Sequence, residues 1–323
     1  MNRTILTPAT IITVVLLSIL MWIGGSVVSD LFHDGNFGLC FPSPNLWVAT
    51  GSWSSALNAL LIILICITLF LTNKRYNLLK SGLPVWALFA LPIIFSMLPV
   101  GGTFTSMPIV TWGALLTIIP LFDSYRAGNA TRNVFFAATW IGIGSMMEYA
   151  MLIFLPALIV GLFCMHIARL KELIAVILGV ITPYWIAMGL GLVGPEDFHI
   201  PQIQPIFSAG LNPRLFPFSL SCGILMLTSA LLTLYNGMKL YAGNSRIRNY
   251  NEVINLFGLS TVLGLLIDTD NYRAYCGVFA IWAALQFANL FTLSQFPRQR
   301  FVYVIILLLI AGSATSQFLY LFG

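Results

Sequence analysis

The sequence predicts an all-α fold: a polytopic transmembrane bundle of about 11 helices. Three observations lead to this expectation: 59% of the 323 residues are hydrophobic, only 8% are charged, and the mean hydropathy is +0.94. A soluble domain carries charge on roughly a quarter of its residues, so this chain has too little polar surface for water. Unbroken apolar runs such as 83–120 also exclude an outer-membrane barrel, whose strands alternate apolar and polar residues.

Each span is placed by its length, because a helix needs about 20 apolar residues to cross the hydrocarbon core. The predicted spans are 9–28, 54–72, 83–100, 107–122, 133–147, 150–168, 173–193, 215–237, 252–267, 274–294 and 302–321. Residues 133–168 are too long for one span, so we place two short helices that turn at Glu148 and Tyr149. The alternative is one tilted span followed by an interfacial helix. No repeat or long linker divides the chain, so 1–323 is expected to form one domain.

The basic residues predict the orientation, because Lys and Arg near span ends stay on the cytoplasmic side. With the N-terminus inside, thirteen of the 15 basic residues lie in cytoplasmic segments, and only Arg214 and Arg273 lie outside. Seven of the ten acidic residues fall outside under the same division. Eleven spans then place the C-terminus at Gly323 outside. The first span is longer than the apolar region of a cleavable signal and is expected to remain as an anchor.

Several function classes are excluded or disfavoured. The net charge of +5 does not indicate nucleic-acid binding, because the chain has no runs of basic residues. The motifs HExxH, GxSxG and the Walker loop are missing, and no CxxC pair predicts a zinc or redox site, so no metal ligands are assigned. His33, His166 and His199 are too few for an iron oxygenase with four histidine ligands.

The cysteines allow one covalent link. Cys40, Cys222 and Cys276 are predicted towards the outer face, where a disulfide is chemically possible. The alternative is that they are buried small apolar side chains.

Four clusters of charged residues on the outer side are candidate sites, because an ionisable group near hydrocarbon is costly and persists mainly where it is used or paired. They are Asp30 with His33 and Asp34; Glu148 with Tyr149; Glu196 and Asp197 with His199; and Asp268 and Asp270 with Arg273. If they converge in an outward cavity, a carboxylate would act as general base or hold a divalent cation, and Arg214 or Arg273 would bind a phosphate. The alternative is that topology alone places each acid outside.

One stretch of the chain, residues 144–186, resembles a bacterial protein family; it reads GSMMEYAMLIFLPALIVGLFCMHIARLKELIAVILGVITPYWI. This stretch is similar to an uncharacterised family of multi-spanning inner-membrane proteins, through a basic loop followed by Gly179, Thr182, Pro183 and Tyr184. The similarity covers about an eighth of the chain and implies the bacterial inner membrane as the location, without an activity.

More distantly, the layout resembles the C-type glycosyltransferases, which use a lipid-phosphate-linked sugar. The resemblance is carried by the cytoplasmic N-terminus, by Asp30 and Asp34 just past the first span, and by the span that ends at Pro183 and Tyr184. The chain departs from the family in two ways: its two Asp residues are not adjacent, and no soluble outer domain follows the last span.

The resemblance implies specific roles for the candidate residues. Asp30 or Asp34 would be the general base for an acceptor hydroxyl, and Arg214 or Arg273 would stabilise the leaving lipid phosphate. Glu148, Asp197 or His199 would help to position the acceptor or a cation. Glu148, in the tightest turn, is also a catalytic candidate together with Asp30 and Asp34.

The sequence is compatible with three functions. The first is an enzyme that acts on a polyprenyl-phosphate sugar at the outer face, and it predicts that the outer acids converge around one cavity. A transporter or flippase for a lipid-linked or small solute predicts a polar path towards Asp123, Glu172 and Glu252 on the cytoplasmic side. A non-catalytic subunit of an envelope complex predicts dispersed acids and a flank of small residues that packs on a partner.

Overall fold

The structure is a computed structural model that describes residues 8–29, 35–49, 51–79, 85–205, 216–241, 244–293 and 299–322. Throughout these ranges the regular structure is helical, with no β-strand. The α-helices are α1 (Pro8–Ser29), α2 (Ser52–Tyr76), α3 (Val85–Ser96), α4 (Leu98–Gly101), α5 (Ser106–Asp123), α6 (Thr131–Met147), α7 (Phe154–Cys164), α8 (Leu170–Gly189), α10 (Phe216–Tyr241), α11 (Ser245–Ile267), α12 (Tyr272–Leu293) and α13 (Gln299–Phe322). Three short 3-10 helices are η1 (Pro44–Leu46), η2 (Tyr149–Ile153) and η3 (Pro195–Asp197).

Every predicted span has a helical counterpart. The span expected at 83–100 is divided into α3 and α4, and the span expected at 150–168 is η2 followed by α7. Eight helices (α1, α2, α5, α8, α10, α11, α12 and α13) are each long and apolar enough to cross a membrane alone. The expectation of a helical bundle of membrane type is therefore confirmed at this level.

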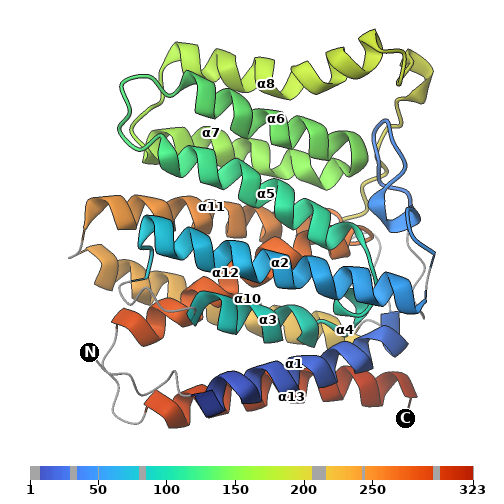
Figure 1. The fold of residues 1–323 in the computed structure, drawn as a ribbon, viewed down its shortest axis with the longest axis vertical. Helices are drawn as coiled ribbons and strands as arrows, with labels where there is room; N and C mark the ends of the chain where they lie inside the picture. Colours follow the sequence, from blue (N-terminus) through green and yellow to red (C-terminus); the bar gives the residue numbers. More distant parts are fainter. Residues whose placement is uncertain are drawn as a thin grey trace.

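The helix break at Glu148 is also confirmed. Glu148 has an extended backbone, which ends α6 at Met147 and lets η2 begin at Tyr149. Figure 1 shows α6 and α7 as antiparallel neighbours. The backbone N–H of Arg126, shortly before α6, donates to the carbonyl of Met165, just after α7. α7 therefore returns to the end of the bundle where α6 began, which is the arrangement expected of two short helices that turn at Glu148.

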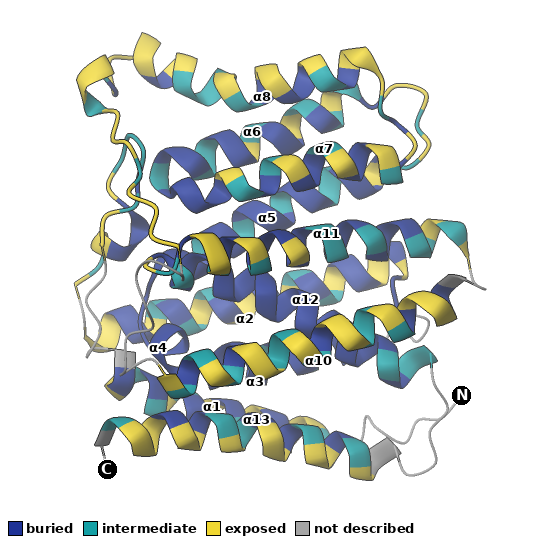
Figure 2. Ribbon diagram, turned by 180° about the vertical axis from the view of Figure 1, so that it is seen from behind, coloured by how far each residue is buried: buried dark blue, intermediate teal, exposed yellow. Residues whose placement is uncertain are grey.

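The helices lie side by side with nearly parallel axes, and α12 is at the centre (Figure 1). Its neighbours include α3, α5, α10 and α11. Phe279, Trp282 and almost every other side chain of α12 are buried, so this helix is dark along most of its length in Figure 2. A helix that is apolar all round is expected to lie in such a core.

Helices α6 and α8 form the closest pair at one edge of the bundle. Gly142 and Gly179 make this approach possible. A Cβ atom on Gly142 would lie 2.5 Å from the carbonyl oxygen of Val180, and one on Gly179 would lie 2.6 Å from that of Phe135. Small residues allow membrane helices to pack backbone against backbone, and here they serve an internal interface.

The outside of the bundle is apolar. Leu20, Trp185 and Leu309 are each more than 60% exposed, and α8, α10 and α13 carry long exposed stretches in Figure 2. Contiguous apolar surface on this scale is unusual for a protein surrounded by water. It is expected of helices whose outer faces contact lipid tails.

The basic residues that the sequence places in the cytoplasm gather at one end of the bundle. Lys74 and Arg75 are in the last turn of α2, and Arg75 pairs with Asp123 at the end of α5 at 2.9 Å. Arg169, before α8, donates to the carbonyl of Gly128, before α6. Helix α1 begins at this end and α13 finishes at the opposite end (Figure 1), as an odd number of segments requires.

Candidate functional site

The end of the bundle opposite the basic residues includes the connecting segments 35–49, 102–105, 148–149, 190–205 and 268–271. Backbone hydrogen bonds join most of them. Tyr149 donates to the carbonyl of Phe37 at 3.0 Å, and His199 donates to that of Leu39 at 2.9 Å. Thr269 donates to the carbonyl of Gln204 at 3.0 Å. The predicted outward segments are thus brought together at one end.

Segment 35–49 is shaped by its own asparagines. The side-chain oxygen of Asn36 accepts from the backbone N–H of Ser43 at 2.9 Å, and that of Asn45 accepts from the first residue of α5, Ser106, at 2.6 Å. Gly38 is required sterically, because a Cβ atom there would lie 1.7 Å from the carbonyl oxygen of Phe41. These contacts hold Ser43 over the turn that contains Glu148.

Glu148 is fully buried in this end of the bundle. Its Oε1 accepts from the side-chain amide of Asn271 at 2.6 Å, and its Oε2 accepts from the hydroxyl of Ser43 at 2.9 Å. The three residues come from separate segments of the chain, so the carboxylate joins segment 35–49 to the α6–η2 turn and the α11–α12 turn.

Asp268 lies beside Glu148 and is 2% exposed. Its Oδ2 accepts from the hydroxyl of Tyr149 at 2.5 Å and from that of Tyr275 at 3.4 Å. We call this assembly the outer cluster; its members are Ser43, Glu148, Tyr149, Asp268, Asn271 and Tyr275.

Both carboxyl groups of the outer cluster are biased towards the protonated form. Burial raises the pKa of Glu148 to about 7, although the hydrogen bonds from Asn271 and Ser43 oppose the shift. Burial also raises the pKa of Asp268, against the hydrogen bond from Tyr149. A neighbouring carboxylate adds to each shift: Asp268 raises the pKa of Glu148, and Asp270 raises that of Asp268, as is expected where acids lie close together in a desolvated site.

Asp197 and His199 lie at the same end but outside the outer cluster. Asp197 closes its own turn, because its Oδ2 accepts from the backbone N–H of Gly194 at 2.7 Å. The Nδ1 atom of His199 is 2.7 Å from the carbonyl oxygen of Asp197, and the imidazole is exposed. The predicted outer acids therefore do not all surround one site. Asp30, Asp34 and Arg214 lie outside the described residues.

Arg273 is in the first turn of α12 and is 4% exposed. Its guanidinium lies 5.9 Å from the ring of Tyr272. Tyr272 also contacts Phe218 of α10, with 5.2 Å between ring centroids. One turn later, the thiol of Cys276 interacts with that of Cys222 on α10. Arg273 therefore lies where α12 meets the beginning of α10.

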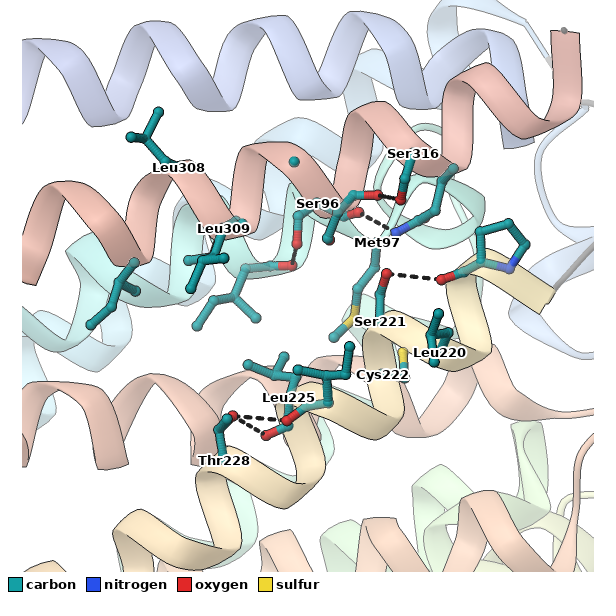
Figure 3. Close-up of a pocket in the computed structure, with 18 of the residues that line it drawn as sticks. Ser96, Met97, Leu220, Ser221, Cys222, Leu225, Thr228, Leu308, Leu309 and Ser316 are labelled. Atoms are coloured by element: carbon teal, nitrogen blue, oxygen red, sulfur yellow. Dashed lines mark hydrogen bonds between the residues drawn. The ribbon is translucent and has the colours of Figure 1, made fainter.

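A cavity of about 860 Å³ lies between α10 and α13, and α3 and α12 also contribute to its lining. Figure 3 shows Leu220, Leu225 and Thr228 of α10 on one side and Leu308 and Leu309 of α13 on the other. None of its lining residues belongs to the outer cluster. We call it the α10–α13 cavity.

Several polar groups along the α10–α13 cavity are already paired within the protein. The hydroxyl of Ser221 donates to the carbonyl of Pro217 at 2.8 Å, and that of Thr228 donates to Ile224 and Leu225 in its own helix. The side chain of Gln317 accepts from the backbone N–H of Leu98 and donates to the carbonyl of Ser96. A ligand in this cavity would therefore make mainly apolar contacts and few hydrogen bonds.

A second polar network lies within the helices. It is made of uncharged amide side chains, so a search of the sequence for charged residues does not find it. Asn255 accepts from Trp282 at 3.1 Å and from Gln286 at 2.7 Å, and Asn236 donates to Gln286 at 3.1 Å. One turn further, Asn289 donates to Asn251 at 2.8 Å. The signal available in the sequence was amide residues at helical spacing in two neighbouring spans. Such bonds hold membrane helices together.

All five cysteines are free thiols in the structure. Among the described residues, no group of three or more His, Cys, Asp or Glu side chains has the geometry to hold a metal ion.

Comparisons with known proteins add no relative to this picture. No protein-family model, no curated protein and no solved structure matches the chain.

Proposed function

We propose that all eleven helical segments cross a bacterial inner membrane, with the basic end of the bundle in the cytoplasm. The gathering of Lys74, Arg75 and Arg169 at one end supports this orientation, because basic residues are retained on the cytoplasmic side. The outer cluster and the beginning of α10 then face outwards.

We further propose that the protein is a glycosyltransferase-like enzyme that acts on a lipid-linked sugar at this outer face. The observation that carries the proposal is the α10–α13 cavity. Phe216 and Leu232 of its lining are sixteen residues apart on α10, which corresponds to about 24 Å along the helix. One leaflet contributes about 15 Å of hydrocarbon, so the cavity suits a chain longer than an ordinary lipid tail.

The reaction would take place where this cavity meets the outer surface. The acceptor hydroxyl would lose its proton to a carboxylate, form a bond to the anomeric carbon, and displace the lipid phosphate from that carbon. Resemblance assigns the base to Asp30 or Asp34. Arg273, beside the first turns of α10, is suited to the charge that develops on the phosphate.

The test of the lipid site uses two matched glycines. Gly312 lines the cavity from α13, whereas Gly223 on α10 is exposed and is not part of the lining; a Cβ atom would meet nothing within 4 Å at either position. Gly312→Phe should fill the cavity and Gly223→Phe should not. We expect a photoreactive polyprenyl-phosphate in nanodiscs to label wild type and Gly223→Phe equally, and Gly312→Phe at least about tenfold less.

Equal labelling of all three proteins would overturn the lipid site. The chemical step is tested separately, by following transfer from a polyprenyl-phosphate sugar to an acceptor. Asp30→Asn should abolish turnover without changing the photolabelling. Lipid labelling without any turnover across a donor panel would remove the enzyme and favour a flippase or a lipid-binding subunit.

A further inference from the structure

The outer cluster has a charge imbalance that its protein contacts do not resolve. Glu148 and Asp268 are both buried, and every side chain that donates to them is neutral: Ser43 and Asn271 to the first, and Tyr149 and Tyr275 to the second. Within the part of the chain that the structure describes, no Lys, Arg or His nitrogen lies within 4.0 Å of either carboxylate. Buried charges are usually paired or bound to a cation.

Two further oxygens at the same place lack a donor. The Oδ1 atom of Asp268 and the Oδ1 atom of Asn271 are buried and have no hydrogen-bond partner. Asn271 contacts both acids: its side-chain nitrogen is 2.6 Å from Oε1 of Glu148, and its backbone N–H donates to the carboxylate of Asp268. The two oxygens without a donor therefore belong to residues that lie against the carboxylate pair. An unsatisfied buried acceptor costs about 1–3 kcal/mol and calls for a specific partner.

We propose that the outer cluster is a calcium site, with Glu148, Asp268 and Asn271 as side-chain ligands. Their oxygens are the hard ligands that Ca²⁺ takes from carboxylates and side-chain amides. The two carboxylates balance the charge of one divalent cation. The site contains no thiol or imidazole, which disfavours zinc and copper. Its burial also disfavours Mg²⁺, which gives up its water reluctantly.

A bound ion at this position would stabilise the fold. Its ligands come from the α6–η2 turn and the α11–α12 turn, and Ser43 ties segment 35–49 to Glu148. Bound Ca²⁺ would therefore fasten three connecting segments of the outer end to one another. This inference is independent of the lipid-linked sugar, since it concerns stability and not turnover.

The experiment uses the full chain, purified in detergent and freed of metal with a chelator. Thermal unfolding is followed at constant ionic strength and pH 8 while CaCl₂, MgCl₂ or NaCl is added. We expect a saturable rise in Tm with Ca²⁺, since a ligand that binds only the folded state stabilises it by mass action. Glu148→Gln and Asp268→Asn should lose the rise. Asp197→Asn, which removes an acid at the same end but outside the outer cluster, should keep it.

Direct binding covers the case in which the variants fold poorly. Wild-type protein in equilibrium dialysis with radioactive Ca²⁺ should bind one ion per chain. The absence of such binding, or an equal Tm in calcium and in sodium, would overturn the site and leave protons to neutralise the two acids. Loss of the rise in Asp197→Asn alone would assign the ion to the surface.

Discussion

The outer cluster and the α10–α13 cavity lie in the same bundle, but they are built in opposite ways. In the outer cluster, buried polar side chains meet at three connecting segments, and each carboxylate accepts from two neutral side chains. In the cavity, two weakly packed helices leave a volume of about 860 Å³, and the polar groups bond to nearby backbone.

This difference separates a charge that holds the fold together from a space that can receive a ligand. Glu148 has the features by which a functional acid is recognised in sequence, yet the structure uses it to join segments of the chain. The accessible volume, in contrast, is lined mainly by apolar residues such as Leu, Ile and Phe, with a few Ser and Thr between them. Substitutions that remove equivalent polar groups from the two regions should therefore have very different effects.

The largest effect is expected for Asn271→Leu in the outer cluster. This change removes the 2.6 Å donor to Glu148 and replaces it with an apolar group of similar size. A buried carboxylate that loses a donor keeps its desolvation cost, so the free energy of unfolding should fall by about 3 kcal/mol. Equilibrium unfolding in mixed micelles measures the change. Combined with Glu148→Gln, the effect should shrink, because the charge that needed the donor has gone; additive effects would show that Asn271 acts elsewhere.

A smaller effect is expected from pH, in protein kept free of divalent cations. The folded-state pKa of Glu148 is raised from 4.5 to about 7, so the folded chain binds the proton more tightly than the unfolded chain. The stabilisation is complete below pH 4.5 and is lost as the pH rises through 7, by about 2 kcal/mol between pH 5 and pH 7. Asp268, whose pKa is also raised, acts with the same sign.

The control for this pH dependence is Glu148→Gln, which keeps an oxygen for Asn271 and Ser43 but cannot titrate. Unfolding midpoints of the variant should vary clearly less between pH 5 and pH 7 than those of wild type. A wild-type protein that gains stability across this range would show that Glu148 is charged in the folded state, with a cation beside it that survives the chelator.

The features that the sequence predicts are local ones, and the features that it does not predict depend on how the helices pack. Helix positions followed from the length of apolar runs, and the turn at Glu148 followed from an acid in the middle of 36 such residues. The partners of Glu148 did not, because Ser43 and Asn271 are 105 and 123 residues away and only the packing of helices brings them together. The α10–α13 cavity gave no signal, since side chains that line a space inside the membrane resemble those that face lipid.

The smallest effect is expected for Thr228→Val in the wall of the α10–α13 cavity. The hydroxyl of Thr228 donates only to the carbonyls of Ile224 and Leu225, which keep their places in the helix without it. Valine has nearly the same shape, so the free energy of unfolding should change by less than about 0.5 kcal/mol. Labelling by the polyprenyl-phosphate probe should be equal to that of wild type or higher, because the lining becomes more apolar. A loss of labelling with unchanged stability would mean that this hydroxyl binds a polar group of the ligand, and the cavity would then hold a headgroup in place of a chain.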